Sequence, residues 1–425
     1  MFSILLLEFR NRLKQVFFIK NSAVKKNFLA LSLLQITNYL VPFITIPYIS
    51  RIFGPELFGI INFATSFLAY FWLLVNYGFD LSATREIAQN KNNHQKIIEI
   101  FNNVLFSKLF LYFIALFIFL IVLFAVDKIN SFKALYLIMF IGGFFNIFFP
   151  TWFFQGIEKL TFTSIFNFIT KLIFTILIFL VIKEDKDYLF YPIALVCGQI
   201  IVAILSMFIT LRKFNIKLYL PSFIKIITTL KNSWQVFATT VVINLYTTTN
   251  LVLLGFLASD YDVGIFTAAY KIAAIFISLI NIPIGQSIYP NIAYSFSQSI
   301  VEGINKIKKM TLYLIPITLT SSIVMFFFPD ILINVLFGQK FAPAMNTVKI
   351  ISFLPLIIGF SNIFGIQGLL NLKKDNYVYF ITLIGAIVGI SLNFILVPIF
   401  KFNGTAISWL MTEIVITILM FFAFF

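Results

Sequence analysis

The chain alternates between long apolar runs and short polar breaks. A helix that crosses the hydrocarbon core of a bilayer, which is about 30 Å thick, needs about 20 consecutive, mostly apolar residues. Twelve runs of roughly that length follow one another. They cover residues 28–50, 57–79, 104–126, 132–154, 161–182, 188–211, 234–257, 264–289, 311–336, 343–370, 377–399 and 404–425. The pattern predicts an all-α integral membrane protein with about 12 transmembrane helices.

Residues 1–27 show a different pattern, in which apolar and basic positions are interleaved. Phe2, Leu5 and Phe9 share this segment with Arg10 and Lys14. The segment lacks the compact apolar core and small-residue cleavage site of a secretory signal. We therefore expect an amphipathic helix that lies in the cytoplasmic interface of the membrane.

The basic residues gather in alternate polar breaks. If the N-terminus is cytoplasmic and the helices alternate in direction, 21 of the 31 lysines and arginines fall in inner segments, Lys108 among them, and 7 in outer segments. Such a bias is typical of cytoplasmic loops. It predicts that both termini are cytoplasmic. It also explains the net charge of +15 through contact with membrane lipids, without any nucleic acid.

Composition excludes several classes of protein. Hydrophobic residues make up 60% of the chain and charged residues 11%, whereas a soluble domain carries roughly a quarter charged residues. A soluble globular enzyme is therefore excluded. The single cysteine, Cys197, and the single histidine, His94, leave no disulfide framework and no Cys- or His-based metal centre. No phosphate-binding loop motif occurs either, so we expect no metal, no cofactor and no ATP hydrolysis.

The middle of the chain is predicted to divide it into two halves. Residues 212–233 contain five basic residues and Pro221, and we interpret them as a basic cytoplasmic linker. On this interpretation, residues 28–211 form an N-terminal six-helix bundle and residues 234–425 a C-terminal one.

Short internal similarities favour two related halves. Gly54–Ala64 reads GPELFGIINFA, and Ser259–Ala269, 205 positions later, reads SDYDVGIFTAA. Asn146 begins an Asn-Ile-Phe string near the end of the fourth predicted helix, and Asn362 begins the same string near the end of the tenth. Together they predict a parallel repeat, an arrangement in which transporters place their substrate between the halves.

Several strings carry a resemblance to a known family. They are PYISRIFGPELFG at 47–59, YGF at 77–79, ATREIA at 83–88, WFFQG at 152–156, SW at 233–234, GIF at 264–266, AYK at 269–271 and GIQ at 365–367. In order and spacing the chain resembles the polysaccharide and O-antigen flippases, a family of the multidrug/oligosaccharidyl-lipid/polysaccharide (MOP) exporter superfamily.

The resemblance implies a fold and a function. Members have two six-helix bundles around a central cavity that opens alternately to the two sides of the membrane. Members similar to this chain move oligosaccharide repeat units linked to undecaprenyl pyrophosphate from the cytoplasmic to the periplasmic leaflet of the bacterial inner membrane. A polysaccharide polymerase is a further candidate partner. We expect a monomer, because one chain contains both halves of the pathway.

One position departs from the family pattern. Many relatives carry an acidic residue just before the Leu-Gly of the seventh helix, whereas this chain has Asn250 there. An amide does not take up or release a proton at neutral pH. Ion coupling through this position is therefore in doubt.

Charges within the apolar runs are candidate site residues, because a charge at the bilayer centre costs about 2.5–3.5 kcal/mol. Lys171 and Glu413 lie near the middle of the fifth and twelfth predicted helices, and Lys271 and Lys349 nearer the outer ends of the eighth and tenth. The lysines are candidates to bind the pyrophosphate. The alternative for Lys271 and Lys349 is that they extend to the interface. Glu413 is a candidate for coupling or for an ion pair.

Arg51 and Arg85 belong to the family-like strings and are candidates to meet the head group at the two mouths of the cavity. The alternative for Arg51 is a cation at a helix C-terminus, and for Arg85 a contact with lipid phosphate. Polar residues of the first and seventh helices could line the cavity or join helices by hydrogen bonds. They are Gln35, Asn38, Tyr39, Asn244, Tyr246 and Asn250.

Two other functions compete with the flippase. A drug exporter of the same superfamily moves amphipathic cations and needs an acidic cavity, which three intrahelical lysines and one glutamate fit poorly. A membrane-embedded polymerase or glycosyltransferase needs acid/base groups and a sizeable loop domain. The predicted outer loops are only a few residues long, so we expect a transporter without catalytic residues.

Overall fold

The computed structural model describes residues 22–283 and 289–425, and it describes their side chains except at 22–40, 243, 246, 247, 279–283 and 290. The helices in chain order are α2 (Ser22–Asn76), α3 (Phe79–Gln89), α4 (His94–Ala125), α5 (Asp127–Asn130), α6 (Lys133–Ile147), α7 (Thr151–Gly156), α8 (Leu160–Val181), η1 (Asp185–Leu189), α9 (Phe190–Lys213), α10 (Phe223–Leu257), α11 (Asp260–Pro283), α12 (Tyr289–Gln298), α13 (Ile300–Phe327), α14 (Pro329–Leu336), η3 (Gln339–Phe341), α15 (Ala344–Ile351), α16 (Leu354–Asn362), η4 (Ile363–Leu369) and α17 (Asp375–Phe424). No strand occurs within the described ranges.

Nine helical segments in the described part of the chain are long and apolar enough to cross a membrane. Each of the twelve predicted runs overlaps one of these segments or α10. The predicted all-α membrane fold is therefore confirmed. The expected amphipathic helix at 1–27 falls mostly on residues 1–21, which lie outside the described residues.

Two of the longest helices each contain a kink, and this explains why twelve runs give fewer segments. Gly54 interrupts α2 with a φ of 68°, and Lys401 interrupts α17 with a φ of 51°. Glycine enters this left-handed region without steric cost, whereas a residue with a Cβ is strained there. Each kink separates two of the runs that the hydropathy pattern predicts.

Contacts divide the chain into two compact units. The first unit comprises the described part of Met1–Ile44 with Trp72–Ile182 and Leu189–Phe237. The second comprises Thr45–Phe71, Lys183–Tyr188 and Ala238–Phe425. The second half of α2 thus belongs to the same unit as α11 to α17. Helix α10 is continuous across the boundary at Phe237.

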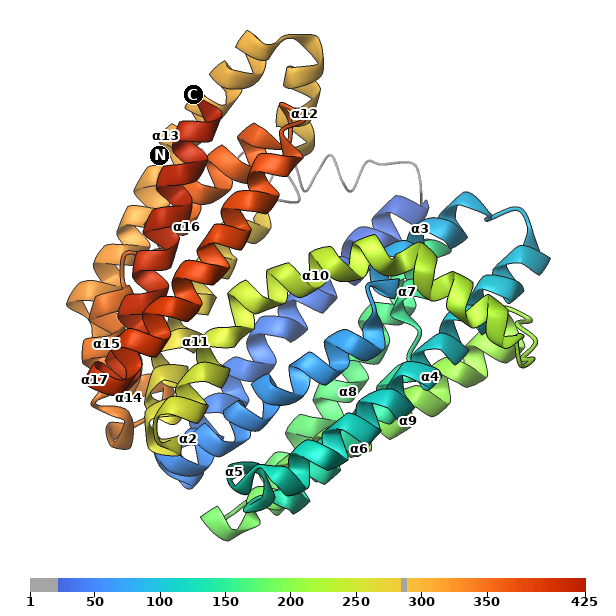
Figure 1. The fold of residues 1–425 in the computed structure, drawn as a ribbon, viewed down its shortest axis with the longest axis horizontal. Coiled ribbons are helices and arrows are strands. Elements are labelled where there is room, and N and C mark those ends of the chain that lie inside the picture. Colours follow the sequence, from blue (N-terminus) through green and yellow to red (C-terminus); the bar gives the residue numbers. More distant parts are fainter. Residues whose placement is uncertain (1–21, 284–288) are drawn as a thin grey trace. The chain divides into compact units, whose positions relative to one another are not determined.

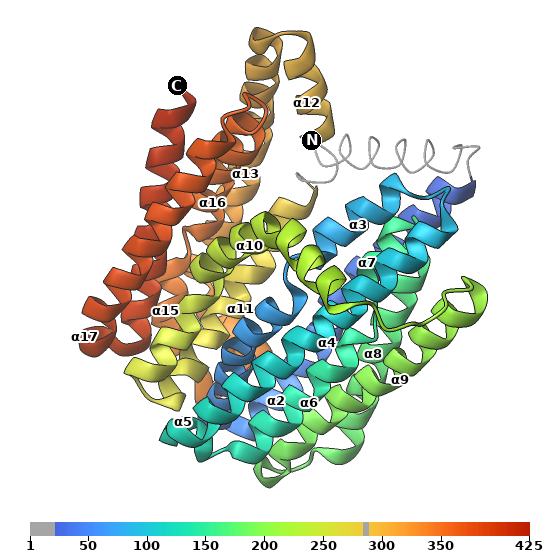
Figure 2. The same ribbon diagram turned by 45° about the vertical axis from the view of Figure 1, so that its right-hand side comes forward.

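The first unit is a helix bundle with an aromatic interior. Helices α4, α6, α8 and α9 run side by side (Figures 1 and 2). The rings of Phe119 and Phe140 stack with their centroids 4.2 Å apart, and Phe101 packs against Trp152 at 5.4 Å. All four side chains are buried. Large aromatic side chains at these positions hold the helices together through extensive apolar contact.

The outer surface of the first unit is apolar as well. Helix α4 exposes Phe113, Phe117, Ile121 and Phe124, which are spaced to form one stripe along the helix. A water-soluble protein rarely exposes such a surface. It fits contact with lipid tails, as the hydropathy pattern predicts.

The second unit is held together by a close contact between α2 and α11. A Cβ atom on Gly59 would overlap the carbonyl oxygen of Asp260, and a Cβ on Gly264 would overlap that of Pro55. Only glycine permits this approach of two backbones. Gly59 and Gly264 occupy equivalent positions in the two similar strings of the sequence, as do Pro55 and Asp260. The contact is therefore reciprocal.

Candidate functional site

The predicted cationic residues are divided between the two units. Lys171 lies on α8 of the first unit and its side chain is half-buried, while Arg85 is exposed on α3 of the same unit. In the second unit, Lys271 on α11 is half-buried, with its Nζ 5.9 Å from the ring centroid of Phe58. Lys349 is exposed on α15. Their role in binding a head group stays a prediction.

Arg51 caps the end of another helix. Its Nη2 atom donates hydrogen bonds to the carbonyl oxygens of Val335, at 3.0 Å, and Asn334, at 3.4 Å, in the last turn of α14. The hydroxyl of Ser50 donates to the carbonyl of Phe337 at 3.3 Å. A cation at this point satisfies carbonyls that have no partner within their own helix. This favours the structural alternative for Arg51.

Two predicted lining residues make defined contacts. The Nδ2 of Asn393, on α17, donates to the Oδ1 of Asn250 at 2.8 Å, and Asn393 is fully buried. The Nδ2 of Asn244 donates to the carbonyl of Thr240 at 2.9 Å. Asn250 therefore links α10 to α17. The side chains of Gln35, Asn38, Tyr39 and Tyr246 lie outside the described residues.

Glu413 lies in a pocket of the second unit, called here the Glu413 pocket. Its side chain is only 5% exposed, and its Oε1 accepts a hydrogen bond from the Nε1 of Trp409 at 3.3 Å. The ring of Tyr270 lies 5.3 Å from that of Trp409. The pocket has a volume of about 530 Å³ and lies between α11, α16, η4 and α17.

Most of the wall of the Glu413 pocket is apolar. The lining residues are Tyr270, Ala274, Ile277, Ser278, Ile358, Ser361, Asn362, Gly365, Ile366, Val378, Thr382, Trp409, Glu413, Ile416 and Met420. The π-helix η4 supplies Gly365 and Ile366. Irregular turns of this kind often occur at functional sites. The coupling role of Glu413 stays a prediction.

The first unit contains a second pocket, called here the Lys108 pocket. Its volume is about 350 Å³, and it is lined by Asn76, Asp80, Lys108, Asn146, Phe149, Thr151, Asn167, Thr170, Gln199 and Val202. Lys108 is 4% exposed, and its Nζ donates to the Oδ1 of Asn76 at 3.0 Å. The hydroxyl of Thr151 donates to Asp80 at 3.4 Å. This is a largely polar pocket around a buried ammonium group.

Sequence reasoning missed Lys108 as a site residue. It stands at the fifth position of the predicted run 104–126, and it was counted with the cytoplasmic segments. In the structure α4 begins ten residues before that run, at His94, so Lys108 lies well within the helix. A lone lysine inside an apolar run was the available signal.

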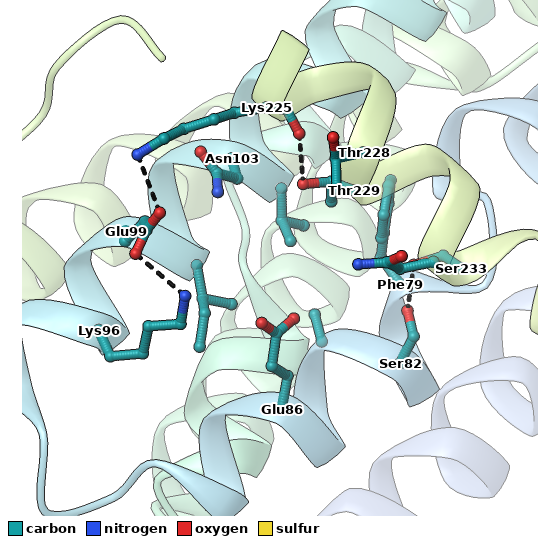
Figure 3. A pocket seen from close by; sticks show the side chains of 14 residues that line it. Phe79, Ser82, Glu86, Lys96, Glu99, Asn103, Lys225, Thr228, Thr229 and Ser233 are labelled. Carbon is teal, nitrogen blue, oxygen red and sulfur yellow. Dashed lines mark hydrogen bonds and ion pairs between the residues drawn. The ribbon is translucent and has the colours of Figure 1, made fainter. Parts of the chain in front are cut away.

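A third pocket lies between the beginning of α10 and helices α3 and α4 (Figure 3). Glu99 lies between two lysines, with its carboxylate 3.0 Å from the Nζ of Lys96 and 2.9 Å from that of Lys225. The buried hydroxyls of Ser82 and Ser233 are 3.0 Å apart. Hydrogen bonding to Glu99 raises the pKa of Lys225 above its usual value. These contacts hold the first part of α10 within the first unit.

Comparison with known proteins decides the family. A family model described as "Polysaccharide biosynthesis protein" matches residues 24–296. The chain is 31% identical over 399 residues to the "Putative O-antigen transporter" of Escherichia coli (strain K12), with 94% of this chain and 96% of that relative covered.

The chain belongs to this polysaccharide biosynthesis family. The predicted resemblance to the O-antigen flippases, made from short strings, is therefore confirmed over nearly the whole chain.

Solved structures show which fold this family member has. An inward-facing multidrug resistance MATE transporter of the MOP superfamily matches with a TM-score of 0.74 at 15% identity, covering 94% of this chain and 97% of that one. The lipid II flippase MurJ, in an inward closed conformation, matches with a TM-score of 0.72 at 14% identity, covering 92% and 87%. The chain has the MOP transporter fold.

Proposed function

We propose that this chain is a flippase that moves lipid-linked oligosaccharides across the bacterial inner membrane. The observation that carries the proposal is the similarity to a putative O-antigen transporter over almost the full length of both proteins. The fold that the chain shares with a lipid II flippase supports the same class of cargo. The lipid tail stays in the bilayer, and the polar head group crosses through the protein.

The cargo we propose is an undecaprenyl-pyrophosphate-linked repeat unit that moves from the cytoplasmic to the periplasmic leaflet. The excess of basic residues in the predicted inner segments supports cytoplasmic termini. The chain acts as a monomer, by alternating access between its two halves, and hands its product to a polysaccharide polymerase. It is a transporter and has no catalytic residues.

Lysines within the membrane supply the charge that attracts the pyrophosphate. Lys171 is the first choice, because it is half-buried in the middle of α8. Lys271, Lys349, Arg51 and Arg85 are further candidates, although the cap that Arg51 forms on α14 lowers its rank. The membrane potential, negative inside, drives the anion outward by about 2.3 kcal/mol per charge per 100 mV.

Glu413 is the residue we propose for ion coupling. It is buried in a mostly apolar pocket of the second unit. The resemblance to the O-antigen flippases implies an acid at position 250, but this chain has Asn250, whose Oδ1 accepts a hydrogen bond from Asn393. Coupling through Glu413 would replace coupling through that position.

Reconstitution into proteoliposomes tests the proposed function. A fluorescent undecaprenyl-pyrophosphate oligosaccharide is added, and its arrival in the opposite leaflet is measured with and without an imposed potential. We expect wild type to flip the lipid, faster when the potential favours the anion. Lys171→Ala is expected to lower this rate at least tenfold, since it removes a charge from the path.

Lys186→Ala is the matched control, because Lys186 is exposed in the short helix η1. It is expected to flip the lipid as wild type does. If Lys171→Ala behaves like the control, Lys171 does not bind the head group. If wild type moves no lipid but extrudes a lipophilic cation, the chain is a drug exporter and the proposal is wrong.

A further inference from the structure

We propose that the Lys108 pocket of the first unit binds a sugar residue of the lipid-linked cargo. The proposal rests on the proposed function, and it assigns one part of the cargo to one set of side chains. Those side chains come from seven helices, α2 to α4 and α6 to α9, and they converge on one volume of about 350 Å³. This size falls in the range of about 300–1,000 Å³ that is usual for small-molecule sites.

The ammonium group of Lys108 has donors to spare. It carries three N–H groups, and its one hydrogen bond among the described residues goes to Asn76. In the same part of the chain it forms no ion pair with a carboxylate, although Asp80 lines the pocket. A buried charge normally has a counter-ion or a full set of hydrogen bonds. Because Lys108 lines the pocket, its other N–H groups are available to a bound molecule.

The mixture of polar groups indicates what that molecule is. Lys108 only donates, the carboxylate of Asp80 only accepts, and the amides of Asn146, Asn167 and Gln199 do both. A sugar hydroxyl also donates and accepts, so neighbouring hydroxyls match this set. A phosphate oxygen only accepts, and it would meet the negative charge of Asp80. The pocket therefore fits a sugar better than it fits the pyrophosphate.

The rest of the pocket wall is apolar and fits the C–H faces of a sugar ring. Phe149 and Val202 line the pocket beside the polar groups. A pyranose has faces made of C–H groups, which pack on aromatic and aliphatic surfaces, while its hydroxyls point outward from the rim of the ring. An aromatic side chain next to hydrogen-bonding groups satisfies both requirements.

A binding measurement separates the sugar from the pyrophosphate. The full chain is placed in lipid nanodiscs and titrated with undecaprenyl pyrophosphate. It is then titrated with the same lipid carrying a single glucose, galactose, N-acetylglucosamine or N-acetylgalactosamine. We expect wild type to bind at least one sugar-bearing lipid about tenfold more tightly than the bare lipid, as one or two hydrogen bonds to a charged group would give.

Two variants of the pocket test the residues. Lys108→Met has a similar length without the charge, and Gln199→Leu removes an amide. Both are expected to remove the advantage of the sugar-bearing lipid and to leave the bare lipid unchanged. Thermal unfolding of each variant in the nanodisc identifies a protein that has not folded, and Gln199→Leu keeps the test valid if Lys108→Met fails to fold.

The controls make every outcome informative. Lys171→Met changes a lysine of the same unit outside the pocket, and we expect it to weaken the binding of both kinds of lipid equally. Lys186→Met is expected to leave the binding of both unchanged. If Lys108→Met weakens the binding of the bare and the sugar-bearing lipid equally, the pocket binds the pyrophosphate and the sugar assignment is wrong. Equal binding of all the lipids by wild type also overturns it and leaves the proposed function standing. If wild type binds none of them, the proposed function itself fails.

Discussion

The Lys108 pocket and the Glu413 pocket surround a buried ionisable side chain with different kinds of residue. The first unit surrounds a cation with amides, hydroxyls and a carboxylate. The second places an acid, whose Oε1 accepts from the indole of Trp409, in a mostly apolar wall. Each pocket is lined by the asparagine that begins one of the two Asn-Ile-Phe strings. Asn146 lines the first pocket and Asn362 lines the second.

Our proposals give the two pockets separate tasks. A pocket with many donors and acceptors can hold a hydroxylated molecule and release it, because each hydrogen bond that is lost is replaced by water. A carboxyl group within a membrane helix can bind a proton or a cation. On this view the first unit recognises cargo and the second unit couples its movement to an ion.

Reversing the charge of Lys108 is expected to give the largest effect. Lys108→Glu places a carboxylate opposite the Oδ1 of Asn76 and in the same pocket as Asp80. An uncompensated buried charge costs about 3–5 kcal/mol, so we expect a large loss of stability and no transport. Thermal unfolding in detergent and the flipping assay measure both. Wild-type stability in this variant would mean that the pocket is open to water and does not distinguish the sign of charge.

Replacing Glu413 by glutamine tests coupling with little change in shape. The amide oxygen still accepts from Trp409, so we expect stability to change by less than about 1 kcal/mol. Flipping driven by a proton gradient is expected to fall about tenfold or more, whereas flipping driven by the potential alone persists. The measurement compares the two gradients in proteoliposomes. An unchanged response to the proton gradient would remove the functional contrast between the pockets.

A smaller effect is expected when the indole donor is removed. Trp409→Phe deletes the hydrogen bond to Glu413 and keeps an aromatic ring beside Tyr270. The lost bond is worth about 1 kcal/mol. We expect a matching loss of stability and a changed dependence of flipping on pH. If flipping keeps its wild-type pH profile, the indole does not govern the state of Glu413.

The smallest effect is expected outside both pockets. Glu99→Gln breaks the exposed ion pairs with Lys96 and Lys225, and such pairs contribute about 0–1 kcal/mol. Binding of the sugar-bearing lipid and the response to the proton gradient are both expected to match wild type. Chemical denaturation at low and high salt measures the ion pairs directly. A clear loss of transport would show that fixing the beginning of α10 matters as much as the two pockets do.

The sequence was sufficient for the architecture but not for the pockets. Twelve apolar runs predict the helices because the hydropathy of each run is a local property. Arg51 and Lys108 show the limit. Their spacing along the chain does not reveal that one caps the end of α14 and that the other shares a pocket with side chains from six other helices. Those contacts depend on how each helix is rotated against its neighbours, which a single sequence does not encode locally.

Glu413 and Asn250 were found because an unusual residue interrupts an expected pattern. A glutamate inside an apolar run can be seen in the sequence, and the resemblance to the O-antigen flippases marks Asn250 as an amide where an acid is expected. The hydrogen bond from Asn393 to Asn250 could not be predicted, because 143 residues separate the two partners. Sequence reasoning therefore identifies candidate residues more readily than it identifies their partners.

The reciprocal contact of Gly59 and Gly264 has a consequence for the history of the chain. Each glycine lies against a carbonyl of the other string, from the residue that corresponds to the one four positions before the glycine itself, as at the isologous interface of a two-fold symmetric dimer. This is the contact expected if an ancestral half-length protein paired with its own copy before the two genes fused. In a homodimer every substitution appears twice. In a single fused chain that constraint is absent, so each half can change independently of the other.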